Sequence, residues 1–80
     1  MEEKIAVVAI IVNDYESVEN VNKLLHDYRD KIIGRLGLPV REKNISVISV
    51  VVNALPEVIN SLSGKLGMIK GVSSKVLTTK

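Results

Sequence analysis

The chain has 80 residues, of which 46% are hydrophobic and 25% charged, and its formal net charge is +2. A chain of this length forms one domain whose surface is large relative to its core, so we expect marginal stability unless association with another chain adds to it. The lack of cysteine excludes disulfides, thiolate metal sites and a cysteine nucleophile, and the interspersed charges leave no extended basic stripe of the kind that binds nucleic acid.

The first predicted element is a strand over residues 5–12, IAVVAIIV, which is apolar at every position. Successive strand side chains point to opposite sides, so this strand needs cover on both faces. Eight residues are too few for a membrane helix, which needs about 20. The start of the chain shows no basic segment before an apolar core and a cleavage site, so we predict no signal peptide and a cytoplasmic protein.

Turn-forming residues at 13–17 lead into a predicted helix, with Asp14 or Ser17 as its N-cap. The apolar stripe of this helix recurs at spacings of three and four, through Val18, Val21, Leu24, Leu25 and Tyr28. Amides at the start of a helix can hold a small anion, which makes Asn13 and Asp14 candidate ligand-binding residues. Simple capping of the helix is the more economical explanation of the same residues.

Residues 32–38, IIGRLGL, predict an edge strand, and Pro39 with the charged residues 41–44 predicts the hairpin loop after it. Residues 45–52, ISVISVVV, form a second strand with two apolar faces. Pro56 then suits a first helical position, and an apolar stripe follows at Val58, Ile59, Leu62 and Leu66. Gly64 and Gly67 suggest a glycine C-cap, and residues 71–77 alternate as a final strand.

This order of elements predicts an α+β, ferredoxin-like βαββαβ fold over residues 1–80, with a four-stranded antiparallel sheet and two helices on one face. The two doubly apolar strands would be central. Helices would cover one face of each, either the face of Ala6, Val8, Ile10 and Val12 or its alternate, and the pattern leaves open which. The other face calls for a protein partner, because only Tyr15 and Tyr28 are aromatic and neither lies in a central strand to stack on RNA bases.

Two further groups are candidate sites. His26 lies near Asp27 and Asp30, but one histidine and two carboxylates on one helix fall short of a usual ligand set, so we predict no metal, no cofactor and no catalytic residue. In residues 34–37, GRLG, glycine amides beside Arg35 can bind an anion, which makes Arg35 and Gly37 candidate ligand-binding residues. Backbone geometry is the simpler reason for these glycines.

Four segments together resemble the family of iron-only hydrogenase system regulators: residues 32–39, 45–52, 61–68 and 71–75. The resemblance covers nearly the whole chain. It implies a single ACT-like domain, similar in fold to the C-terminal half of the nickel-responsive repressor, that forms homo-oligomers, dimers or tetramers, through the sheet or its edges. Nickel sensing does not carry over, because that repressor uses several histidines and a cysteine, and this chain has only His26.

These features and the family resemblance together predict a non-enzymatic regulatory domain that binds a small ligand and works as a homo-oligomer, without direct contact to nucleic acid or membrane. The resemblance implies that its regulation is linked to transcription and tied to iron-only hydrogenase maturation. A protein partner would carry its signal. The alternative is a structural assembly subunit without a ligand. A small hydrolase on the same fold is disfavoured, because residues 13–16, NDYE, are acidic where a phosphate loop would need arginine and glycine.

Overall fold

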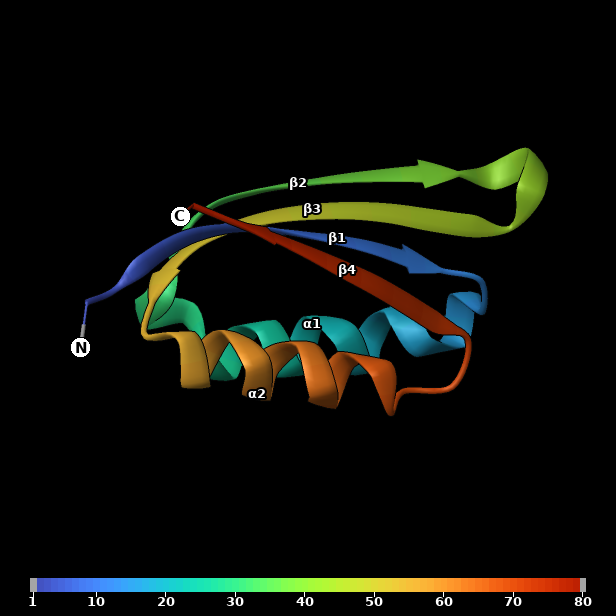
Figure 1. Cartoon of the computed structure of the whole chain (residues 1–80). Helices are drawn as coiled ribbons and strands as arrows, with labels where there is room; N and C mark the ends of the chain where they lie inside the picture. The colour runs from blue at the N-terminus through green and yellow to red at the C-terminus, as the bar shows by residue number, and fades with distance from the viewer. Residues whose placement is uncertain (1, 80) are drawn as a thin grey trace.

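A computed structural model describes residues 2–79, which form one antiparallel sheet in the order β2-β3-β1-β4 with both helices on one face (Figure 1). The strands are β1 (Lys4–Val12), β2 (Ile32–Val40), β3 (Ile45–Ala54) and β4 (Val72–Thr78). The helices are α1 (Val18–Asp27) and α2 (Pro56–Gly67), with short 3-10 turns η1 (Tyr15–Ser17), η2 (Arg29–Lys31) and η3 (Arg41–Lys43). The predicted fold class and the central place of β1 and β3 are confirmed.

The register of the strands decides which face of β1 meets the helices. Ala6, Val8, Ile10 and Val12 are buried, and they lie opposite Val52, Val50, Ile48 and Ser46 of β3. The alternate residues of β1 point to the other side of the sheet, where Ile5, Val7 and Ile11 stay 39%, 38% and 41% exposed. The helices therefore cover one set of apolar side chains and leave the other set uncovered.

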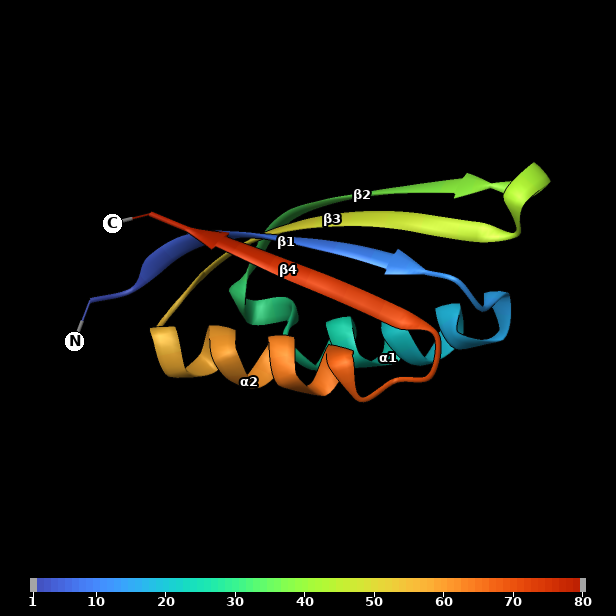
Figure 2. The ribbon, with the colours of Figure 1, turned by 45° about the vertical axis from the view of Figure 1, so that its right-hand side comes forward.

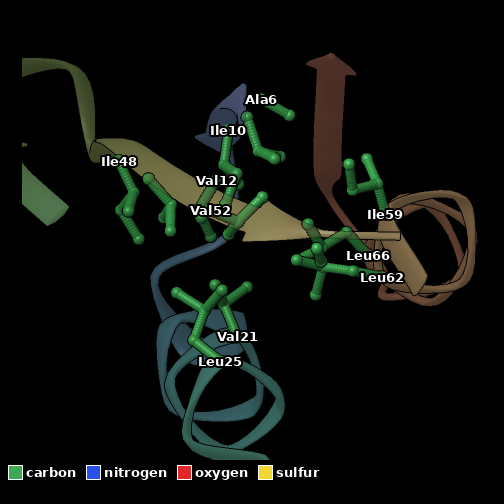
Figure 3. Packing of buried hydrophobic residues seen from close by; sticks show 13 residues of the cluster. Ala6, Ile10, Val12, Val21, Leu25, Ile48, Val52, Ile59, Leu62 and Leu66 are labelled. Atoms are coloured by element: carbon green, nitrogen blue, oxygen red, sulfur yellow. The ribbon is translucent and has the colours of Figure 1, made fainter. Parts of the chain in front are cut away.

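The core fills the space between the sheet and the two helices (Figure 3). From the helices it receives Val21 and Leu25 of α1 and Ile59, Leu62 and Leu66 of α2. These residues belong to the two predicted apolar stripes. Full burial of one such side chain contributes about 1.5–3 kcal/mol to stability, so this single layer supplies most of the energy that holds the helices to the sheet.

The start of α1 divides the predicted capping roles between two residues. The Asp14 carboxylate accepts a hydrogen bond from the Glu16 amide at 3.1 Å, so it caps η1 rather than α1. Ser17 occupies the N-cap position of α1 without a capping bond from its side chain. Its buried hydroxyl instead donates to the Lys70 carbonyl at 2.7 Å. Ser17 thus ties the start of α1 to the loop between α2 and β4.

Two local predictions were wrong. Pro39 lies inside β2, opposite Ser46, and not in the hairpin loop. An edge strand tolerates proline because one side of its backbone needs no strand partner. The glycine C-cap of α2 is also absent: the helix includes Gly67, and its C-cap is Met68 in a right-handed helical conformation. The chain turns back only at Gly71, where φ is +75°.

Gly71 allows the α2–β4 loop to lie against the end of β1. The Asn13 amide donates to the Gly71 carbonyl at 2.7 Å. A Cβ atom placed on Gly71 would lie 2.8 Å from the Cβ atom of Asp14, closer than real Cβ atoms approach. Both the positive φ and this contact require glycine.

We expect Gly71→Ala to lower the free energy of unfolding by about 2–4 kcal/mol, because alanine adds left-handed strain and a steric clash. Gly64→Ala is the matched control, since its Cβ atom would meet no atom within 4 Å. In a helix interior that change stabilises by about 0.5–1 kcal/mol. Urea unfolding of both variants measures the difference, and equal effects would contradict the close approach of Gly71 and Asp14.

Candidate functional site

The face of the sheet away from the helices, here called the outer face, is largely apolar. From β1 and β3 the strand registers place on it Ile5, Val7, Ala9, Ile11, Ile45, Val47, Ser49, Val51 and Asn53. From the edge strands they add Gly34, Leu36, Leu38, Val40, Ser73, Lys75 and Leu77, of which the three leucines are 60%, 53% and 75% exposed. Of all residues that the registers place on this face, Lys75 alone is charged.

The molecule also exposes more surface than its mass requires. Its accessible surface is 5400 Å² for 8.8 kDa, whereas a compact monomer of this mass exposes roughly 4,800 Å². The elongated shape, 42 × 19 × 19 Å, accounts for the excess. A wide apolar face on so small a domain is typical of a surface that another protein covers.

The tip of the β2–β3 hairpin extends beyond the end of the helical layer (Figures 1 and 2). A groove of about 540 Å³, which we call the hairpin groove, lies between this hairpin and the start of the helical layer. One wall comes from η1 and α1 and the other from β2 and β3. The lining residues are Tyr15, Val18, Glu19, Asn22, Arg35, Gly37, Pro39, Ser46 and Ile48.

Strand alternation aims Arg35 into this groove. Arg35 lies opposite Val50, and Gly37 lies opposite Ile48, so both belong to the helix side of the sheet. The Arg35 guanidinium reaches α1, where its Nη2 donates to Asn22 Oδ1 at 2.7 Å. This hydrogen bond joins the edge strand to the helix across the groove.

A second hollow of about 250 Å³ adjoins the hairpin groove, and Asn22 and Arg35 line both. Its other lining residues are Leu25, His26, Arg29 and Ile32. We call it the basic hollow, because Arg29, Arg35 and His26 line it. Arg29 Nη1 donates to the His26 carbonyl at 3.0 Å, which holds the guanidinium along the helix end. The two cavities meet at the pair formed by Asn22 and Arg35.

The structure brings together two of the four predicted ligand-binding residues. Arg35 and Gly37 line the hairpin groove. Asn13 and Asp14 do not line it. They pack against Gly71 instead, directly before Tyr15, which does line the groove.

Sequence reasoning missed one wall of the cavities. Five residues that line them repeat at spacings of four and three along η1, α1 and η2: Tyr15, Glu19, Asn22, His26 and Arg29. Residues at these spacings share one helical face. This polar row beside the apolar stripe was the available signal.

His26 takes part in no cluster that could hold a metal. Within residues 2–79, histidine, aspartate and glutamate side chains do not gather in groups of three or more. In the same part of the chain, neither helix is long and apolar enough to cross a membrane.

A polar cluster also joins the two helices. The Tyr28 hydroxyl lies 3.1 Å from the Ser61 hydroxyl, and Lys65 Nζ lies 5.5 Å from the centre of the Tyr28 ring. The hydrogen bond from Ser61 lowers the pKa of Tyr28, and Lys65 acts in the same direction, which outweighs burial and the nearby Asp27. None of its residues lines the hairpin groove or the basic hollow, so we assign the cluster to the joining of α1 and α2.

The comparison with known proteins gives one family. The model of the TM1266-like family, described as "Iron-only hydrogenase system regulator, putative", matches residues 4–76. The chain is similar to the solved structure of the uncharacterized protein TM1266 from Thermotoga maritima, with 40% sequence identity and a TM-score of 0.95, over 99% of this chain and 100% of that chain. No curated protein matches.

A more distant likeness concerns the fold alone. The C-terminal domain of the MgtC protein from Mycobacterium tuberculosis is 12% identical, with a TM-score of 0.77 over 96% of this chain and 88% of that chain. At this identity the two domains share an architecture, and an architecture can carry unrelated functions.

In a Tyr15→Phe background, where Tyr28 is the remaining tyrosine, we expect Tyr28 to ionise below its ordinary pKa of about 10. The pKa is lowered in the folded state, so the stability from this ionisation is complete above about pH 10 and is lost as the pH falls through the folded pKa. Ultraviolet titration of tyrosinate measures it. Ser61→Ala should raise the pKa, whereas the control Ser63→Ala should not; equal titration curves would contradict the assigned cause.

Proposed function

Because the chain belongs to the family of iron-only hydrogenase system regulators, we propose that it is a non-catalytic, cytoplasmic regulatory domain that senses a small ligand as a homo-oligomer. A protein partner passes its signal to transcription. The chain has no extended basic stripe, and both helices pack on the sheet, so neither is free to enter a DNA groove as a recognition helix does.

The observation that carries the proposal is the hairpin groove. Small-molecule sites are concave, mostly apolar and supplied with a few polar groups that orient the ligand. The hairpin groove has apolar walls at Val18, Pro39 and Ile48, and its polar lining includes Arg35 with its hydrogen-bond partner Asn22. Its volume of about 540 Å³ falls within the usual range for such sites, about 300–1,000 Å³.

The position of the groove suggests how a ligand could alter assembly. Arg35 and Gly37 face the groove, while Leu36 and Leu38, the residues that alternate with them, lie on the outer face. One strand therefore takes part in both surfaces. A ligand that holds β2 at a different distance from α1 would move part of the outer face, and it shifts assembly by its difference in affinity between the two arrangements.

A second copy of the chain is the proposed cover of the outer face. Leu36, Leu38 and Leu77 extend the apolar area of β1 and β3 to both margins of the sheet. The β2 edge itself is a poorer surface for strand pairing, because it contains Pro39 and a bulge between Ile32 and Gly34, and both features hinder pairing at an edge. We therefore favour packing of sheet on sheet.

The first experiment measures thermal unfolding and oligomer mass with a library of small metabolites. A ligand of the folded state at 100 times its dissociation constant stabilises by about 2.7 kcal/mol, which raises the Tm of a domain this small by roughly 10 °C or more. We expect such a ligand to change the oligomer mass by light scattering. A ligand that stabilises the protein without changing the oligomer mass would contradict the proposed coupling between ligand binding and assembly. The absence of any stabilising metabolite would favour an assembly subunit without a ligand.

The second experiment places a charge in the middle of the outer face. We expect Val7→Glu to convert the oligomer to monomer at micromolar concentration, because the interface would bury an unpaired carboxylate. Met68→Glu is the matched control, since Met68 is 86% exposed at the end of α2, away from the sheet. Circular dichroism checks that both variants fold. An oligomer that survives Val7→Glu unchanged would show that assembly uses another surface.

A further inference from the structure

We propose that the hairpin groove and the basic hollow together bind a small amphiphilic anion, with a carboxylate or phosphate head in the basic hollow and an apolar body in the groove. This inference rests on the proposed sensing function and names the class of ligand for that site. The two cavities share Asn22 and Arg35, so one extended molecule can occupy both.

The lining of the basic hollow favours a negative head group. The basic residues Arg29, Arg35 and His26 line it, and neither aspartate nor glutamate is among its lining residues. Each guanidinium has five N–H donors in a planar fork that matches carboxylate and phosphate oxygens. The bonds from Arg29 to the His26 carbonyl and from Arg35 to Asn22 each occupy one nitrogen. Donors therefore remain on both side chains.

The hairpin groove favours an apolar body and opposes a negative head. Val18, Pro39, Ile48 and the Tyr15 ring supply its apolar lining. The carboxylate in this lining is Glu19, one turn before Asn22 on α1, and it would repel an anion placed there. The charges of the site thus set one orientation, with the head toward Arg29.

The size of the groove suits a ligand much larger than an inorganic ion. A water molecule occupies about 30 Å³ in the liquid, so a groove of about 540 Å³ holds a body of many heavy atoms. At Gly37 a Cβ atom would meet nothing within 4 Å, so the strand backbone is open to the groove at this position. A ligand body can therefore lie directly against β2.

Four probes with one apolar body test the ligand class: hexanoate, hexyl phosphate, hexanamide and hexylamine. Titration of the isotope-labelled full chain, followed by NMR at the Gly37 amide, gives each dissociation constant. We expect hexanoate or hexyl phosphate to bind at least tenfold more tightly than hexanamide and hexylamine, and the better of the two identifies the head group. Acetate and inorganic phosphate, which lack the body, should bind at least tenfold more weakly than their hexyl counterparts.

Arginine variants separate the site from general charge attraction. Arg35→Gln should weaken the binding of the anionic probes at least tenfold and remove their higher affinity relative to hexanamide. Arg41→Gln removes the same charge at the hairpin tip, outside both cavities, and should change affinity less than twofold. Equal losses in the two variants would overturn the proposal.

Failure of this inference differs from failure of the sensing function. Equal or tighter binding of hexanamide or hexylamine at Gly37 overturns the anionic class and leaves the groove as a ligand site. If no probe shifts the NMR signal of the Gly37 amide, the proposal of an amphiphilic anionic ligand is also overturned. The metabolite screen then tests the sensing function separately.

Discussion

The structure depends on one constraint: β1 and β3 are apolar on both faces, and two helices can cover only one of them. Their antiparallel pairing, which joins Lys4 to Ala54 and Val12 to Ser46, places both strands at the centre of the sheet. The buried face then forms the core with α1 and α2. The opposite face remains largely apolar, so the same pairing that builds the core also creates the outer face on which we propose assembly.

The edge strand β2 connects this surface with the candidate binding site. Its side chains alternate between the helix side, where Arg35 and Gly37 line the groove, and the outer side, where Leu36 and Leu38 are exposed. The tip of this hairpin extends beyond the end of the helical layer (Figure 2). A strand with few buried contacts is the part of a domain that moves at least cost in free energy, which suits a strand that has to respond to a ligand.

Particular residues show how far the sequence led toward the site and where it stopped. Arg35 was predicted as a ligand-binding residue from its glycine neighbours, and it does line a groove, but its partner Asn22 was not predicted. The row that contains Asn22 has helical spacing, yet only the position of β2 shows that this face of α1 looks onto a strand. The predicted glycine C-cap of α2 was wrong for a similar reason. The glycine that the chain needs after this helix is Gly71, and the contact that requires it comes from Asp14, far away in the chain.

The sequence by itself determined the order of the elements, the central strands, the apolar stripes of both helices and the need for cover on a second sheet face. These properties follow from local periodicity and from the two apolar runs, which are visible along the chain. The tertiary structure alone decided which face of β1 the helices cover, that Asn13 and Asp14 lie outside the groove, and that Arg35 meets Asn22. These depend on strand register and on the path of the hairpin, which bring together residues that no local pattern connects.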